Sequence, residues 1–127
     1  MQYILNMRPV FNKEALFSDG TRYYRNPTEP KSGEKVIISF RTQKNNVDAV
    51  YLVSGDQKYK MKVYKTTKGF DYYGTKIVMP EEIFRYHFEI QYGWATCYYT
   101  EQGVFSELQE WAQFEIYPNY HTPDWAK

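Results

Sequence analysis

Cysteine and histidine are scarce in this chain of 127 residues, which holds one cysteine and two histidines. A single cysteine excludes an internal disulfide and favours a reducing compartment, so we expect the protein in the cytoplasm. His87 and His121 lie far apart, and no spacing of His, Cys and Asp is typical of a zinc site. We therefore predict no metal and no cofactor, with His87 on the outward surface of a strand and Cys97 as a buried thiol.

Long apolar runs and a strong net charge are also missing. No stretch approaches the roughly 18 apolar residues of a membrane span, and the start of the chain lacks the basic and apolar regions of a secretory signal. The 16 basic residues nearly balance the 15 acidic ones, for a net charge of +1, whereas nucleic-acid binders are normally clearly basic. These absences predict a protein that binds neither a membrane nor a nucleic acid.

Motifs for common catalytic chemistry are absent as well. The sequence has no glycine-rich phosphate loop and no Gly-x-Ser-x-Gly elbow. Glycoside hydrolysis needs two carboxyl groups about 5–10 Å apart in one cleft. Asp71 with Glu89, or Asp56 with Glu107, are formal candidates, but the spacing favours neither pair. The residues by themselves therefore do not indicate an enzyme.

Aromatic residues, in contrast, are abundant, at 20% of the chain. Strand-rich domains accumulate them because aromatic rings suit half-buried pleated surfaces. Rings also stack on flat ligands such as sugars. We attribute about two-thirds of the excess to strands and the remainder to a binding surface.

Alternation of apolar and polar residues predicts short strands along the whole chain. The predicted strands are residues 14–17, 34–42, 47–53, 58–65, 70–79, 83–92, 95–100 and 111–117. Turn signals separate them every 8–12 residues or so, and no long helical period is present. The pattern predicts an all-β fold, an antiparallel immunoglobulin-like β-sandwich of about eight strands. A β-barrel is the structural alternative.

The segment 58–65 shows a particularly sharp alternation. Lys58, Lys60 and Lys62 are predicted to share one face of a single strand. A lysine row is compatible with an anion site, yet lysines on an outer face more often keep it in water and block edge-to-edge pairing. Because acidic residues nearly match basic ones, we interpret the row as a solvated face.

Four aromatic residues are candidates for a carbohydrate-binding surface. They are Tyr59, Tyr64, Tyr72 and Trp94, the last at a predicted hairpin tip. The apolar C–H face of a sugar stacks on such a ring, while neighbouring polar side chains bind its hydroxyls. The same residues suit a protein interface, where Tyr and Trp are enriched.

The last ten residues carry two prolines, Pro118 and Pro123, followed by Trp125. Proline removes a backbone donor and favours extended geometry in the residue before it. A tryptophan in such a segment needs a surface to pack on. We expect residues 1–120 to form one domain and 121–127 to be a linker to a further domain, with Pro123 and Trp125 at the interdomain contact.

Several segments occur in an order and spacing that resemble one enzyme group. They are Phe-Arg-Thr-Gln-Lys at 40–44, Val-Asp-Ala-Val at 47–50, Ser-Gly-Asp at 54–56, Phe-Asp-Tyr-Tyr at 70–73, Arg-Tyr-His-Phe at 85–88, Tyr-Thr-Glu-Gln-Gly at 99–103 and Thr-Pro-Asp-Trp-Ala-Lys at 122–127. Together they resemble the N-terminal immunoglobulin-like, starch-binding-type domain of neopullulanases, cyclomaltodextrinases and maltogenic amylases. The resemblance runs from about Val36 to the end of the chain.

The resemblance implies a non-catalytic domain in front of an α-amylase-type (β/α)₈ barrel, whose catalytic carboxylates all lie beyond Lys127. The enzyme it implies is a glycoside hydrolase acting on α-glucans, cyclodextrins or pullulan. The implied partners are the chain's own barrel, a second subunit that narrows the active-site cleft, and α-glucan oligosaccharides. Among the aromatics, Tyr59 lies nearest to a sugar-contacting position of the group. The alternative is a free-standing immunoglobulin-like protein-interaction domain with no carbohydrate role.

Overall fold

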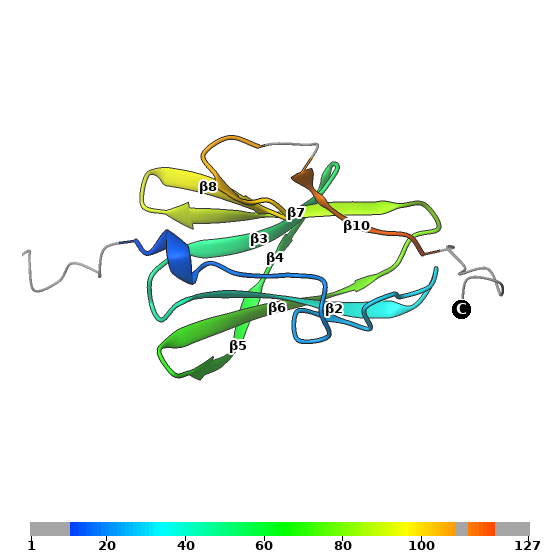
Figure 1. Ribbon diagram of the computed structural model, residues 1–127, viewed down its shortest axis with the longest axis horizontal. Coiled ribbons are helices and arrows are strands. Elements are labelled where there is room, and N and C mark those ends of the chain that lie inside the picture. The colour runs from blue at the N-terminus through cyan, green and yellow to red at the C-terminus, as the bar shows by residue number, and fades with distance from the viewer. Residues whose placement is uncertain (1–10, 109–111, 119–127) are drawn as a thin grey trace, which may run out of the picture.

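A computed structural model of the protein describes residues 11–108 and 112–118. These residues form two antiparallel sheets, of four and six strands, that pack face to face (Figure 1). The predicted immunoglobulin-like β-sandwich is thus confirmed as the architecture, with ten strands among the described residues where about eight were expected.

Each sheet draws its strands from distant parts of the chain. The four-stranded sheet has the order β1 (Arg25–Asn26), β2 (Lys35–Gln43), β6 (Phe70–Val78) and β5 (Lys62–Thr67). The six-stranded sheet has the order β4 (Gln57–Lys60), β3 (Ala49–Ser54), β7 (Phe84–Tyr92), β8 (Ala95–Thr100) and β9 (Gly103–Phe105), while β10 (Phe114–Ile116) pairs with the first half of β7.

The first predicted strand, over residues 14–17, is instead a short 3-10 helix, η1 (Lys13–Ala15). The side chain of Asn12 accepts a hydrogen bond from the backbone N–H of Glu14 at 3.1 Å and so caps the helix. An Asn before a short polar segment favours such a cap over a strand. Pairing is limited to a single bridge between Phe17 and Arg41.

The core consists of the inward-facing residues of both sheets, and aromatic rings dominate its centre. The rings of Phe40 and Phe88 lie 4.6 Å apart across the two sheets, and those of Tyr86 and Phe114 stack at 5.0 Å. Tyr99 meets Phe40 edge-on at 5.3 Å. Strand alternation therefore predicted the main core faces, because every second residue of β2 and β7 points inward.

A polar contact between side chains crosses this core. The guanidinium of Arg25, on β1, donates from Nε and Nη2 to the hydroxyl of Tyr86 on β7, at 3.1 and 2.9 Å. Burial raises the pKa of the Tyr86 phenol, so the hydroxyl stays protonated at neutral pH. The contact joins the edge strand of one sheet to a central strand of the other.

The predicted single strand over residues 58–65 is wrong, because the chain changes sheets at Met61. Lys58 and Lys60 belong to β4 in the six-stranded sheet, whereas Lys62 begins β5 in the four-stranded sheet. Met61 itself is buried, and its N–H donates to the carbonyl of Val50 at 2.9 Å. The three lysines therefore do not form a row on one face.

His87 is buried at 3% exposure, so its prediction as a surface residue is wrong. Its Nδ1 shares a hydrogen bond of 2.9 Å with the Oε1 of Gln113, and its ring meets that of Tyr98 edge-on. Gln113 directly precedes β10, and local alternation does not reveal that β10 pairs with β7.

Cys97, in contrast, is a buried free thiol as predicted, and burial raises its pKa.

Candidate functional site

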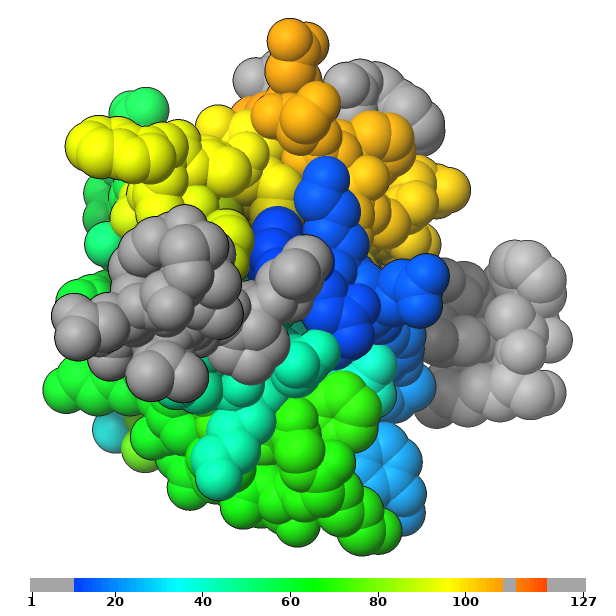
Figure 2. Space-filling model, turned by 90° about the vertical axis from the view of Figure 1, so that its left-hand side faces the viewer, coloured from blue at the N-terminus to red at the C-terminus, as the bar shows by residue number. Residues whose placement is uncertain are grey.

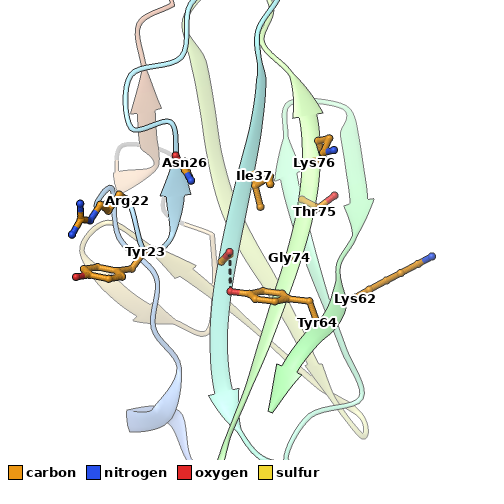
Figure 3. Close-up of a pocket in the computed structure, with 10 residues that line it drawn as sticks. Arg22, Tyr23, Asn26, Ile37, Lys62, Tyr64, Gly74, Thr75 and Lys76 are labelled. Atoms are coloured by element: carbon orange, nitrogen blue, oxygen red, sulfur yellow. Dashed lines mark hydrogen bonds between the residues drawn. The ribbon is translucent and has the colours of Figure 1, made fainter. Parts of the chain in front are cut away.

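The outer face of the four-stranded sheet carries a groove of about 510 Å³, within the range of small-ligand sites (Figure 3). Its residues come from β1, β2, β5, β6 and the segment that leads into β1. They are Arg22, Tyr23, Asn26, Ile37, Ser39, Lys62, Tyr64, Gly74, Thr75 and Lys76. This face lies away from the core, so the groove is open to a ligand without any rearrangement of the sandwich.

Tyr64 forms the centre of the groove, and the local strand geometry holds its ring against the sheet. The pairing of β5 with β6 shifts register between Val63 and Lys65, which places Tyr64 at an irregularity in the strand. Gly74 lies beneath the ring, where an added Cβ would approach the Cδ1 of Tyr64 to 3.0 Å. A glycine here therefore lets the ring lie close to the strand.

The hydroxyl of Tyr64 reaches across β6 and donates to the Oγ of Ser39 on β2 at 3.4 Å, as Figure 3 shows. The ring is thus supported along its length by Gly74 and at its tip by Ser39. Tyr64 nevertheless remains 55% exposed. An oriented ring with an open face is the arrangement on which a sugar can stack.

Tyr23 supplies a second ring on the opposite side of the groove (Figure 3) and is 71% exposed. It lies in a turn that the carboxylate of Asp19 organises, accepting from the N–H and the hydroxyl of Thr21 at 2.9 and 2.6 Å. The carbonyl of the next residue, Tyr24, accepts a hydrogen bond from the N–H of Ser39 at 2.9 Å, which ties the turn to β2. Partial burial raises the pKa of Tyr24.

The charged side chains that line the groove are all cationic: Arg22, Lys62 and Lys76. In Figure 3, Arg22 and Lys62 extend outward on opposite sides of the groove, while Lys76 lies above it on β6. The guanidinium of Arg22 also lies 5.4 Å from the centre of the Tyr23 ring. The groove therefore combines an apolar, aromatic centre with a cationic rim and with neutral polar groups from Asn26 and Thr75.

This arrangement suits binding rather than bond cleavage. Among the described residues, no group of His, Cys, Asp and Glu is placed to hold a metal ion. Asp71 and Glu89, the first formal carboxylate pair, lie on different sheets and have other partners. Asp71 accepts from the N–H of Asn45 and the hydroxyl of Thr66, and Glu89 forms an ion pair with Lys58. The groove itself contains no carboxylate.

The structure brings together two of the four aromatic residues that the sequence singled out. Tyr64 lies in the groove, and the centre of the Tyr72 ring is 6.5 Å from it on the same face, beneath the ammonium of Lys65. Tyr59 lies on β4 in the other sheet, partly buried against the core. Trp94 is fully exposed at the β7–β8 turn, the yellow hairpin that projects at this end of the molecule in Figure 2.

The sequence did not identify Tyr23 or Asn26 as site residues. It also did not predict that Lys62 and Lys76 line one groove. Residues 20–25 show no alternation, so no strand periodicity indicates which way the ring of Tyr23 points. The available signal was the Asp-Gly-Thr turn, followed after Arg22 by two tyrosines. Pro123 and Trp125, the predicted interdomain contact, lie outside the described residues.

Comparisons with known proteins agree with this fold. The chain superimposes on a cyclomaltodextrinase with a TM-score of 0.70 and 24% identity, over 81% of this chain and 19% of that one. A maltogenic amylase from S. marinus matches with a TM-score of 0.68 and 13% identity, over 90% and 15% of the two chains. The type III pullulan hydrolase from Thermococcus kodakarensis matches with a TM-score of 0.53 and 15% identity, over 80% and 16%.

Three further findings bear on the kind of protein. Within residues 11–108 and 112–118, no helix is long and apolar enough to cross a membrane. The chain spans only 15–19% of the length of the three similar enzymes. Residues 25–120 match the family described as "Alpha amylase, N-terminal ig-like domain", which covers most of the sequence. The protein therefore belongs to the alpha amylase N-terminal immunoglobulin-like domain family.

Proposed function

We propose that this chain is the non-catalytic N-terminal domain of a glycoside hydrolase that degrades α-glucans, cyclodextrins or pullulan, and that it contacts α-glucan through the groove on the four-stranded sheet. The observation that carries the carbohydrate role is the Tyr64 ring, supported by Gly74 and Ser39 with its outer face exposed. The similar structures named a cyclomaltodextrinase, a maltogenic amylase and a pullulan hydrolase support the enzyme class.

The groove recognises sugar through two aromatic rings and one polar side chain. The C–H face of a glucose unit stacks on Tyr64, and the next unit reaches Tyr23 on the other side. Hydroxyls bind the amide of Asn26, which both donates and accepts hydrogen bonds. Because the rings are already exposed and oriented, little conformational entropy is lost when the sugar binds.

The rest of the proposed function concerns assembly. Residues 121–127 link the domain to a catalytic barrel, against which Pro123 and Trp125 pack. The domain also contacts a second subunit and thereby narrows the active-site cleft to small oligosaccharides. Trp94, fully exposed at a turn, suits such a protein contact, since aromatic rings are enriched at interfaces. The buried free thiol of Cys97 fits a cytoplasmic location.

Titration of the 127-residue chain with maltoheptaose, followed by amide chemical shifts, tests the sugar contact. We expect shifts at Gly74 and Lys62, with a dissociation constant of about 1 mM. Tyr64→Ala should weaken binding about tenfold, because the stacking surface is lost. Trp94→Ala is the matched control, since this ring is more exposed but lies at the β7–β8 turn, outside the groove.

Two outcomes would overturn the proposed site. The first is the absence of any shift in the groove at millimolar sugar. The second is loss of binding in the Trp94→Ala chain with no loss in Tyr64→Ala, which would move the contact to the β7–β8 turn.

A further inference from the structure

The four-stranded sheet is strongly cationic, although the whole chain is nearly neutral. Its strands carry six basic residues, Arg25, Lys35, Arg41, Lys62, Lys65 and Lys76. Asp71 is the one carboxylate on these strands, and both of its oxygens accept hydrogen bonds from Asn45 and Thr66. Arg25 reaches into the core, and the other five cations give a positive potential to the face that contains the groove.

Some of these cations already have partners within the domain. Arg25 donates to Tyr86, Arg41 lies 4.5 Å from the centre of the Phe70 ring, and Lys65 lies 4.6 Å from that of Tyr72. Lys62 and Lys76 line the groove, and neither forms an ion pair within the described part of the chain. Their charges are available to a ligand.

The rim of the groove favours an anion over a neutral sugar. Lysine and arginine donate hydrogen bonds and accept none, and the lining offers no carboxylate to accept from a sugar hydroxyl. Hydrogen bonds from a cation to an anionic oxygen are roughly twice as strong as neutral ones. A phosphate monoester carries a charge of about −1.5 to −2 near pH 7, so it gains most from this rim.

We propose that the groove selects α-glucan that bears phosphate monoesters, an inference that rests on the proposed function of the same site. A glucose unit stacks on Tyr64, and a phosphate on one of its outward hydroxyls reaches Lys62 or Lys76. The outward direction of Lys62 in Figure 3 matches a substituent that projects from the edge of a stacked ring. Lysine suits this task because its flexible stem lets the ammonium follow the phosphate.

The test compares two polymers that differ only in phosphate. Amylopectin with phosphate monoesters, and the same batch after enzymatic dephosphorylation, are each titrated into the 127-residue chain by calorimetry. We expect the phosphorylated polymer to bind about fivefold more tightly at about 0.05 M salt, and this preference to shrink at about 0.5 M salt as the charges are screened. Inorganic phosphate alone should bind much more weakly than the phosphorylated polymer.

Charge-matched variants assign the effect to the groove. The double variant Lys62→Gln and Lys76→Gln should bring the affinity ratio of the two polymers to about 1. Lys44→Gln with Lys60→Gln removes the same net charge from exposed positions outside the groove, and it should keep the ratio of the unaltered chain.

Each outcome has a distinct meaning. Equal affinity for both polymers overturns the inference and leaves the proposed glucan contact standing. No binding of either polymer overturns both. A ratio that falls equally in the two double variants, or inorganic phosphate that binds as tightly as the phosphorylated polymer, overturns the inference in favour of non-specific anion binding.

Discussion

The outer faces of the two sheets use charge in different ways. On the six-stranded sheet, Lys58 pairs with Glu89 and Arg85 with Glu115, each at 2.7 Å. On the four-stranded sheet, cations lie over aromatic rings or line the groove, and its one carboxylate lies at the end of the β5–β6 hairpin, bonded to Thr66. The first face pairs four of its five charged strand residues with one another, whereas the second leaves cations and rings exposed.

The two sheets therefore differ in role: one mainly stabilises the fold, and the other carries the proposed binding surface. The six-stranded sheet gains a strand, β10, whose Phe114 closes the aromatic core against Tyr86. The four-stranded sheet instead has an irregular edge strand with Tyr64 lying over Gly74. Four substitutions, ordered from the largest expected effect, can break or sharpen this contrast.

Phe114→Ala should lower the free energy of unfolding by about 3–5 kcal/mol, since it removes a buried ring and leaves a cavity. Tyr64→Ala, on the outer face of the four-stranded sheet, should change the free energy of unfolding by less than about 1 kcal/mol. Urea unfolding followed by circular dichroism measures both. If the two variants lose similar stability, the outer face of the four-stranded sheet also stabilises the fold. The proposed division between a stabilising sheet and a binding sheet would then be wrong.

Gly74→Ala should weaken maltoheptaose binding about tenfold, or about 1.4 kcal/mol. The new Cβ would approach the Cδ1 of Tyr64 to 3.0 Å and displace the ring from the sheet. The same substitution made in a Tyr64→Ala chain should have no further effect, because the ring it acts on is gone. If the losses of binding free energy from the two substitutions add in the double variant, Gly74 affects binding independently of the Tyr64 ring.

Arg41→Lys should lower stability by about 1 kcal/mol. Arg41 donates from Nε to the carbonyl of Ala15 at 3.0 Å and lies over the rings of Phe70 and Phe17. Lysine keeps the charge but loses the planar donor and the stacking. Thermal melting measures the loss of stability. Lys65→Gln removes a more exposed cation from an aromatic ring, so it should lower stability by less than Arg41→Lys.

Glu115→Gln should have the smallest effect, about 0.2–1 kcal/mol at neutral pH. Hydrogen bonds from Arg85 and Tyr117 hold the pKa of the Glu115 carboxyl below its usual value. A lowered folded pKa contributes stability above the unfolded value of about 4.3, and that stability is lost as pH falls through the folded pKa. The difference in free energy of unfolding between the unaltered chain and Glu115→Gln should therefore disappear in acid. Urea unfolding between pH 7 and pH 3 measures it.

A matched control for that titration is Glu107→Gln, an exposed carboxylate outside the paired network. Its stability curve should follow that of the unaltered chain. If the loss of stability in Glu115→Gln stays constant down to pH 3, the charge of Glu115 has no role. Such a result would indicate a packing effect instead.

The surface around the groove could be predicted from the sequence only in part. Tyr64 and Tyr72 follow from their positions on strands with one outward face, and the structure places their rings close together. Tyr59 was chosen by the same reasoning but lies on the other sheet, and Trp94, chosen as a hairpin tip, lies at the turn between two strands of that sheet. Alternation shows which face of a strand a residue occupies, but it does not show which sheet the strand joins.

Local pattern by itself determined the strands of residues 35–43, 70–78 and 84–92, their inward faces and the burial of Cys97. These features follow from a period of two residues and from turn residues, which act over short distances. Only the tertiary structure decided that the chain changes sheets at Met61, that Gln113 covers His87, and that Tyr23 and Tyr64 line one groove. Each of these depends on pairing between residues far apart in the chain, and such pairing is selected by the packing of the whole core.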